Sequence, residues 1–538
     1  YEEHGRECVK YLRGMFAFAI WDLRTRGLFM ARDRLGIKPL YYHYEGNRLL
    51  FGSEIKTILA HPGIKPEFNR GTLAEYLAFG YIPEPETMYA GIRKLLPGHT
   101  LEIGETGDVQ ISQYWDLQIA ADDGDRQREF YVARYRELLE QCVSSHLMSD
   151  VPLGVFLSGG LDSSAVAALT TKIRREPIET FAVGYGEESF SELPFARKVA
   201  AHIGSRHYEV RLSREEFFQA LPRLIWHEDE PIVWPSSLSL YFVAKRARER
   251  VTVVLTGEGS DETLAGYTRY AWTLTNARLD AAYRAVVPAF LRDLVRNSTQ
   301  FGLLSSSVRR KLEHTFLVRD GASWPSFFFD NFYSAFSAAE QAELLTPEAR
   351  AAAGDAYAGS MRYWKASSGD LLHRMLYSDI KTYLVELLMK QDQMSMAASV
   401  ESRVPFLDHK LVEFTATIPA KYETRGMAGK HILKAAVEDM LPREIIYRQK
   451  MGFPTPWEYW LNGPQLKSLE ELLSEPRTLA RGYFRPEAIR RLFAEHRSGT
   501  RDHGSRIWRL LNLELWHRVC LESEPTEEAV PSQAAAAV

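Results

Sequence analysis

The chain has 538 residues, of which 45% are hydrophobic and 25% are charged. This mixture is typical of a globular protein and excludes a collagen, a coiled coil or a wholly disordered chain. Its 66 Lys and Arg residues stand against 70 Asp and Glu, a formal net charge of -4, so no global basic field points to nucleic acid. Three cysteines are too few for a disulfide framework or a zinc cluster, and no apolar run reaches the roughly 18 residues of a membrane helix. We therefore expect a cytoplasmic protein without a membrane span.

The first part of the chain, from Arg13 to about Tyr114, carries short β-rich blocks between turn signals, which predicts an antiparallel β region. The blocks are Met15–Trp21, Gly27–Ala31, Leu40–Tyr44 and Leu49–Phe51. A domain boundary is expected near residues 116–128, where the chain turns polar. Because the chain begins with Tyr1 and shows no targeting pattern, we expect sequence to be missing upstream.

The next part alternates strand-like and helix-like blocks, which indicates crossover helices on a doubly wound parallel sheet. The predicted strands are Val151–Leu157, Ile178–Val183, His207–Leu212 and Val251–Thr256, and the predicted helices between them include Asp162–Ile173 and Ser191–His202. After Tyr267 the pattern becomes mainly helical to about Val519. Residues 522–538 have low complexity and are expected to be disordered.

The strongest chemical signal is the run Leu157-Ser-Gly-Gly-Leu-Asp-Ser-Ser164, which leaves an apolar strand and enters an apolar helix. Small residues allow the backbone to approach an anion, and the free amides at a helix start favour negative charge. The alternative is a tight strand-to-helix turn in which Asp162 is only a polar first-turn residue. The hydroxyls and the carboxylate gathered in this run favour a phosphate cradle.

A second loop, Gly257-Glu-Gly-Ser-Asp-Glu262, follows the predicted strand Val251–Thr256. Both loops leave the carboxyl ends of parallel strands, so they can meet over one nucleotide. The carboxylates of this loop could coordinate a metal or form a solvated helix start. With a phosphate cradle opposite, Mg²⁺ held by Asp162 and Asp261 is favoured, because Mg²⁺ prefers carboxylates together with phosphate oxygens.

Two further blocks complete a pattern. One runs from Lys390 through Gln393 to Asp408, and the other comprises Gly429-Lys-His431 and Tyr447-Arg-Gln-Lys-Met-Gly-Phe-Pro454. The first loop resembles the PP-loop of the ATP pyrophosphatases. All four motifs together resemble the synthetase domain of the glutamine-hydrolysing asparagine synthetases, over about Arg128–Val519.

The N-terminal runs Leu12–Asp22, Ala31–Tyr41 and Phe51–Lys56 resemble the later half of that family's glutaminase domain. The resemblance implies an α/β protein, with a PP-loop doubly wound parallel sheet and a large helical extension. A partial antiparallel α+β N-terminal-nucleophile region would precede it. The expected domains are residues 1–120, a partial glutaminase domain, residues 128–521, the synthetase domain, and the tail 522–538.

The resemblance implies ATP-dependent amidation of the aspartate side chain through an acyl-adenylate, giving asparagine, AMP and pyrophosphate, with ammonia from glutamine in the full-length protein. ATP would be held by Leu157, Ser158, Gly159, Gly160, Asp162, Ser163, Ser164, Val183 and Gly257. Asp162 and Asp261 would bind Mg²⁺. Glu258 would serve the amidation step as an acid–base or orienting group, and Lys450 would stabilise charge on the phosphates. Positioning and charge neutralisation would supply most of the catalysis.

Several alternatives stay open. Lys450 could be a solvated lysine, and Arg403 and Asp408 could form a buried structural pair. Many members of the family carry Arg where this chain has Gln393, and Gln lacks the bidentate charged fork that reads a carboxylate. The acceptor could therefore be a different carboxylate, in an amidotransferase or cyclase acting on a secondary-metabolite, peptide or polysaccharide precursor. The chain could also be an inactive nucleotide-binding regulator. No nucleic-acid or membrane partner is expected, and a homodimer is left open.

The glutaminase fold uses a cysteine at the mature N-terminus as its nucleophile, whereas this chain begins with Tyr1. Cys8 precedes an apolar block and is more simply a core thiol. We therefore expect no glutaminase activity from the chain as given.

Overall fold

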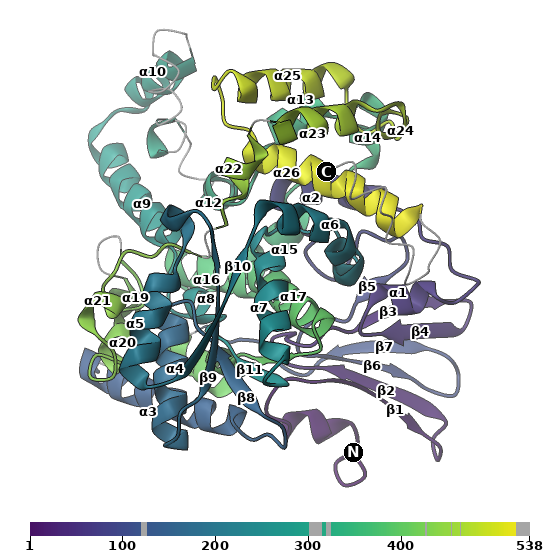
Figure 1. Ribbon diagram of the computed structural model, residues 1–538. Coiled ribbons are helices and arrows are strands. Elements are labelled where there is room, and N and C mark those ends of the chain that lie inside the picture. The colour runs from purple at the N-terminus through teal and green to yellow at the C-terminus, as the bar shows by residue number, and fades with distance from the viewer. Residues whose placement is uncertain are drawn as a thin grey trace.

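The computed structural model describes residues 1–119, 126–300, 312, 315–318, 324–424, 428–452, 455–462 and 464–522, without the side chains of 298–300 and 464. Figure 1 shows antiparallel strands at one end, a parallel sheet at the centre and helices around it. The predicted tail lies outside the described residues except for Glu522, and so does the central part of the predicted boundary, residues 120–125.

The N-terminal part contains two antiparallel sheets, as the β-rich blocks predict. The larger sheet has the order β1-β2-β6-β7, with β1 (Ala17–Asp22), β2 (Gly27–Arg32), β6 (His99–Ile103) and β7 (Val109–Gln113). The smaller sheet has the order β4-β3-β5, with β4 (Arg48–Gly52), β3 (Tyr41–Glu45) and β5 (Arg93–Lys94). Helices α1 (Ile55–Leu59) and α2 (Leu73–Phe79) follow β4. Cys8 is buried beside the larger sheet, as expected of a core thiol.

The central sheet is parallel throughout, with the order β10-β9-β8-β11-β12. Its strands are β8 (Leu153–Phe156), β9 (Glu179–Tyr185), β10 (Arg206–Leu212), β11 (Val253–Leu255) and β12 (Glu401–Arg403). Helices α3 (Arg128–His146), α4 (Leu161–Arg174) and α5 (Leu193–Ile203) cover one face, and α6 (Arg214–Glu228), α7 (Ser236–Arg248) and α17 (Tyr383–Ala397) lie on the other (Figure 1). The doubly wound sheet is therefore confirmed. Strand β12 was not predicted, because Glu-Ser-Arg carries no apolar pattern.

The remainder is mainly helical, as predicted. The α-helices that complete it are α8 (Ser260–Thr263), α9 (Thr268–Val286), α10 (Ala289–Gln300), α12 (Trp324–Phe332), α13 (Ala338–Leu344), α14 (Pro347–Ala352), α15 (Ala358–Ala366), α16 (Leu371–Lys381), α18 (His409–Thr415), α19 (Ala420–Glu423), α20 (His431–Ala436), α21 (Arg443–Ile446), α22 (Trp457–Leu461), α23 (Pro464–Ser474), α24 (Pro476–Leu479), α25 (Pro486–Arg497) and α26 (Gly504–Trp516). Short 3₁₀-helices span Gly5–Lys10, Arg70–Thr72, Glu188–Phe190, Phe316–Val318 and Pro405–Leu407, and a π-helix spans His517–Leu521. Within the described residues, none of the helices combines the length and apolarity needed to cross a membrane.

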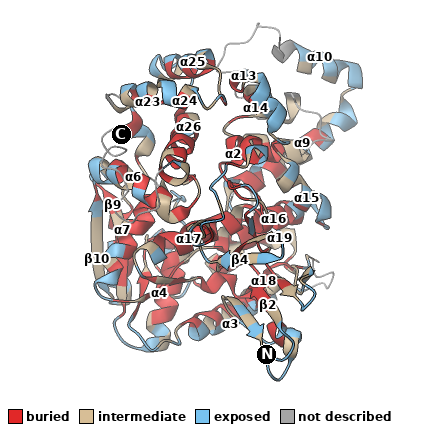
Figure 2. Ribbon diagram, turned by 90° about the vertical axis from the view of Figure 1, so that its right-hand side faces the viewer, coloured by how far each residue is buried: buried red, intermediate tan, exposed pale blue. Residues whose placement is uncertain are grey.

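Helix α17 joins the two parts of the chain. It is buried along most of its length, as Figure 2 shows. Lys38 of the N-terminal part pairs with Asp392 of α17 at 2.6 Å, and Lys94 pairs with Glu230, which follows α6, at 2.9 Å. One apolar cluster also contains residues of both parts. The antiparallel region is thus packed directly against the part that contains the parallel sheet.

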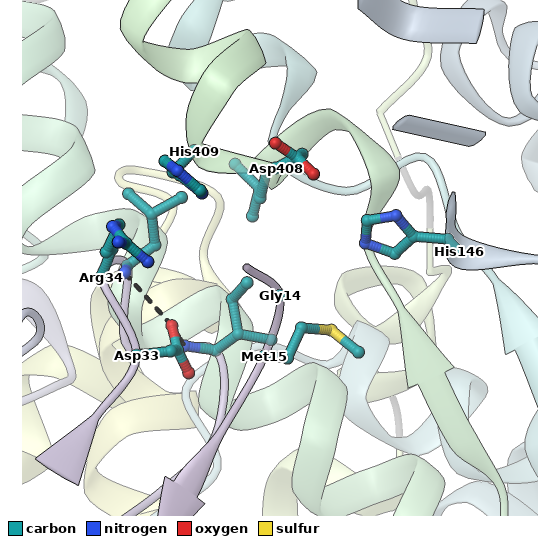
Figure 3. A pocket seen from close by; sticks show the side chains of 10 residues that line it. Gly14, Met15, Asp33, Arg34, His146, Asp408 and His409 are labelled. Carbon is teal, nitrogen blue, oxygen red and sulfur yellow. Dashed lines mark hydrogen bonds between the residues drawn. The ribbon is translucent and has the colours of Figure 1, made fainter. Parts of the chain in front are cut away.

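A small cavity of about 10 Å³ lies at this junction, where Asp33 and Met15 face His146 and Asp408 (Figure 3). Asp408 accepts a hydrogen bond from Arg13 Nε at 2.7 Å. Arg403 instead pairs with Glu401 at 2.8 Å and donates to two main-chain carbonyls. The suggested Arg403–Asp408 pair is therefore wrong, because each side chain has another partner.

Candidate active site

The two predicted loops lie against each other at the carboxyl ends of β8 and β11, which are neighbours in the sheet. Gly257 lies in the loop after β11 and packs against the start of α4. A Cβ atom at this position would lie 2.6 Å from the amide nitrogen of Ser163. Only glycine allows this approach without displacing the helix. The structure thus brings together the two motifs that the sequence separates by about 100 residues.

The first loop has the geometry of an anion cradle. The Ser158 amide donates to Ser163 Oγ at 3.2 Å, and the Gly160 amide donates to Ser158 Oγ at 3.1 Å. Helix α4 starts at Leu161, and no side chain caps its N-terminus. Gly159 has a φ of +75°, and a Cβ atom there would lie 2.5 Å from the amide nitrogen of Ala196. The uncapped amides and the dipole of α4 are suited to a phosphate group.

Two lysines stand among the carboxylates of the site. Lys430 Nζ lies 2.6 Å from Asp162 Oδ2 and 2.7 Å from Asp261 Oδ1, and Lys450 Nζ lies 2.5 Å from the same Asp261 oxygen. The Lys430 side chain is 6% exposed. Burial alone would raise the pKa of Asp261, but the two ammonium groups hold that pKa well below its ordinary value. Asp261 is therefore ionised at neutral pH.

The other carboxylates of the second loop are only partly accessible. Glu262 is buried and accepts a hydrogen bond from Tyr267 Oη at 2.6 Å. Burial, together with the charges of Asp261 and Glu258, raises the pKa of Glu262 to about 7. Glu258 Oε2 lies 4.0 Å from Lys390 Nζ. A solvated helix start is therefore wrong for this loop, because Asp261 and Glu262 are enclosed and paired.

The remaining predicted nucleotide-binding residues lie around the first loop. Leu157 is buried directly after β8, and its amide donates to the Phe181 carbonyl at 2.8 Å. Val183 is half-buried on the neighbouring strand β9, and Ser164 is buried in the first turn of α4. Their roles toward ATP stay predictions.

Two basic residues of the site received no role from the sequence. Lys430 occupies the N-cap position of α20, and its backbone has the left-handed conformation with φ +59°. Arg448 pairs with Glu192 and lies 4.4 Å from the Phe195 ring centre, next to the Gly160 turn. Both belong to the block that comprises Gly429–His431 and Tyr447–Pro454, but chain order does not show that their side chains turn toward the first loop.

Gln393 is buried within α17, and its amide nitrogen donates to the Glu228 carbonyl at 3.0 Å. Its amide therefore joins α17 to the end of α6. This contact gives position 393 a packing role between helices in this chain.

The donor set fits Mg²⁺ and a nucleotide phosphate. Asp162 Oδ1 is a buried oxygen without a hydrogen-bond partner among the described residues. In the same part of the chain, no group of three or more His, Cys, Asp or Glu side chains is arranged to hold a metal ion alone. Mg²⁺ usually takes one or two protein carboxylates and completes its shell with phosphate oxygens and water. Asp162 and Asp261 match that requirement.

Comparisons with known proteins agree with this geometry. Residues 134–518 match the asparagine synthase family, and residues 1–115 match a glutamine amidotransferase domain. An asparagine synthetase [glutamine-hydrolyzing] 1 of Bacillus subtilis is 30% identical, over 99% of this chain and 82% of the relative. A putative asparagine synthetase [glutamine-hydrolyzing] of Mycobacterium tuberculosis is 35% identical, over 97% and 79%. "Amidase chyE" of Penicillium rubens is 28% identical, over 90% and 75%.

The fold and the site define a carbon–nitrogen ligase that performs ATP-dependent amidation. The chain belongs to the asparagine synthase family, and its type is that of the glutamine-hydrolysing asparagine synthetases.

Proposed function

We propose that the chain converts aspartate, ATP and ammonia to asparagine, AMP and pyrophosphate through an acyl-adenylate. The observation that carries this proposal is the pair of facing loops, with Asp162 and Asp261 joined by Lys430. An uncapped helix start, two carboxylates and two lysines form one cluster suited to a triphosphate.

Mg²⁺ bound to Asp162 and Asp261 would neutralise phosphate charge and help pyrophosphate to leave. The chain's own residues supply the rest. The first loop holds the leaving pyrophosphate through the hydroxyls and amides of Ser158–Ser164, while Leu157 and Val183 lie on the side proposed for adenosine. Lys450 stabilises the charge that builds on the phosphates as the carboxylate attacks the α-phosphorus.

Glu258 serves the second half of the reaction. Ammonia loses a proton as it attacks the acyl-adenylate, and Glu258 is the partly accessible carboxylate of the second loop that can accept it. Lys390, whose Nζ lies 4.0 Å from Glu258 Oε2, orients this carboxylate. The buried Glu262 is bonded to Tyr267 and is less available for that role.

The second candidate is amidation of another carboxylate. It is favoured by the relative named "Amidase chyE", which is 28% identical over 90% of this chain and carries a different name. The Gln393 side chain donates to the main chain and carries no charged fork for a carboxylate, so the Arg-to-Gln change also leaves this second candidate open.

The test is pyrophosphate release with ATP, Mg²⁺ and ammonium across a panel of carboxylates, with aspartate, glutamate, N-acetylaspartate and succinate as the first members. The proposal expects release with aspartate and formation of asparagine in equal amount. Release with another carboxylate but not with aspartate would support the second candidate, and a Glu258→Gln variant should lose amidation more than adenylation.

A further inference from the structure

An aromatic ring contacts the proposed phosphate-stabilising lysine. Lys450 Nζ lies 4.1 Å from the ring centre of Tyr267, within the range of a cation–π interaction. Tyr267 immediately precedes α9 and follows the second loop, and its hydroxyl is fixed on Glu262. The ring is thus tied to the same loop that carries Asp261.

Lys450 needs such support because its own segment has little regular structure. The chain around it, from Tyr447 to Met451, forms no helix or strand, and the Lys450 side chain is 42% exposed. A lysine on four rotatable bonds loses much conformational freedom when it is held in one place. The ring of Tyr267 and the carboxylate of Asp261 together define where its ammonium group lies.

The Tyr267 ring is itself held by a buried assembly. Arg269 Cζ lies 3.8 Å from the ring centre, and Arg269 donates to Asp379 at 2.8 Å. Asp379 also accepts hydrogen bonds from the hydroxyls of Tyr270 and Tyr333, each at 2.5 Å. These residues come from α9, from α16 and from the position directly after α12, so the ring contacts packed helices rather than a free loop.

We propose that Tyr267 is a positioning residue, whose ring face holds the Lys450 ammonium group beside Asp261 before the nucleotide binds. The proposal rests on the role given above to Lys450. It predicts that the position of the Lys450 ammonium group depends on the electron density of the ring face. The hydroxyl group and the size of the side chain should affect that position less.

The first test measures the placement of Lys450 without any reaction. Lysine acetylation by acetic anhydride in the nucleotide-free protein is followed by mass spectrometry, with Lys198 as internal control because it is about half exposed and carboxylate-paired, like Lys450. We expect Tyr267→Leu to raise acetylation of Lys450 threefold or more, while Tyr267→Phe stays within twofold of wild type. Unchanged acetylation of Lys450 in Tyr267→Leu would overturn the proposal.

A second measurement separates ring electronics from packing and covers the case in which Tyr267→Leu fails to fold. Phenylalanines with one, two and five fluorine atoms at position 267 keep a flat ring but progressively weaken its negative face. Acetylation of Lys450 should rise along this series. A flat response would show that the ring is only structural. Tyr333→Leu is the packing control, because the Tyr333 ring also lies on Arg269.

The third test is a double-mutant cycle on pyrophosphate release. Tyr267→Leu should slow the first turnover roughly threefold to thirtyfold, the range of a cation–π contact. In a Lys450→Ala background the same change should add no further loss, because its effect acts through that lysine. Equal losses in both backgrounds would overturn the proposal. Failure of the proposed function would appear instead as wild-type protein that releases no pyrophosphate, while the acetylation results still report the placement of Lys450.

Discussion

Replacing Lys430 by methionine tests the charge arrangement of the site directly. In the structure its ammonium group bridges Asp162 and Asp261, and the Lys430→Met change removes this charge while it keeps most of the apolar stem. The neighbouring Lys434 of α20, which is half-buried and makes no bridge between the two aspartates, provides the matched control Lys434→Met.

The magnitude follows from the burial of the pair. Removing one partner of a buried ion pair costs about 3–5 kcal/mol, because the other charge stays enclosed. Asp261 keeps Lys450, and the Asp162 side chain is 20% exposed, so we expect a cost at or just below the lower end of this range, about 2–3 kcal/mol. Unfolding entropies of ~2.1 cal/mol/K per residue give roughly 1.1 kcal/mol/K for a chain of this length, so the melting temperature should fall by about 2–3 °C in a single transition.

The assay is thermal unfolding in EDTA and in millimolar MgCl₂. Lys430→Met should melt below wild type and below Lys434→Met in EDTA. Mg²⁺ should stabilise Lys430→Met more than wild type, because a bound cation then replaces the missing charge without competing with an ammonium group. Equal melting of Lys430→Met and wild type in EDTA would refute the bridge, and equal Mg²⁺ responses would refute Asp162 and Asp261 as a metal pair.

Three further predictions concern single residues. Lys450→Ala should lower kcat for pyrophosphate release about 10- to 100-fold and leave ATP affinity nearly unchanged, because the lysine charge matters most as the phosphates gain charge. A large loss of ATP affinity at constant kcat would show instead that Lys450 binds the ground state. Asp261→Asn should raise the Mg²⁺ concentration needed for half-maximal release, and an unchanged Mg²⁺ dependence would exclude it as a ligand. Burial raises the pKa of Glu423 to about 8, so this carboxyl stays protonated in the folded chain while it ionises near pH 4 in the unfolded chain. Stability is therefore lost as pH rises from about 4 to 8, and Glu423→Gln should flatten that slope by up to ~1.4 kcal/mol per pH unit; parallel melting curves from pH 5 to 8 would contradict this.

Sequence patterns predicted those strands and helices whose own residues show an apolar periodicity or a turn motif. The strands of the parallel sheet were found because apolar runs end in glycine-rich loops, and β11 differs from its predicted span by two residues at its start and one at its end. Strand β12 carries polar residues at all three positions, so only its neighbour β11 specifies it. Its pairing is a tertiary effect, which periodicity within a single segment does not contain.

The site was predictable to the extent that its residues lie in contiguous motifs. Asp162 and Asp261 follow two strands that proved to be neighbours, and the rule that ligands bind at the carboxyl ends of parallel strands joins them. Lys430 comes from a distant helix start, where its backbone takes the left-handed conformation and its side chain contacts both aspartates. That conformation is rare for a lysine, so the sequence gives no reason to expect it.

The placement of Lys430 and Lys450 also explains how so many charges are enclosed before any nucleotide arrives. Buried carboxylates are costly unless they are paired, and here the chain pairs Asp162 and Asp261 with its own ammonium groups. In the proposed function, Asp162 and Asp261 would hold Mg²⁺, and Lys430 and Lys450 would pair with the phosphates. Each ion pair would then be replaced by another, and no charged group would be left unpaired. This exchange requires that both lysines stand close to the aspartates at the start. Lys430 is held near the aspartates by its buried position at the start of α20. Lys450 lies on an irregular segment, and the ring of Tyr267 holds its ammonium group.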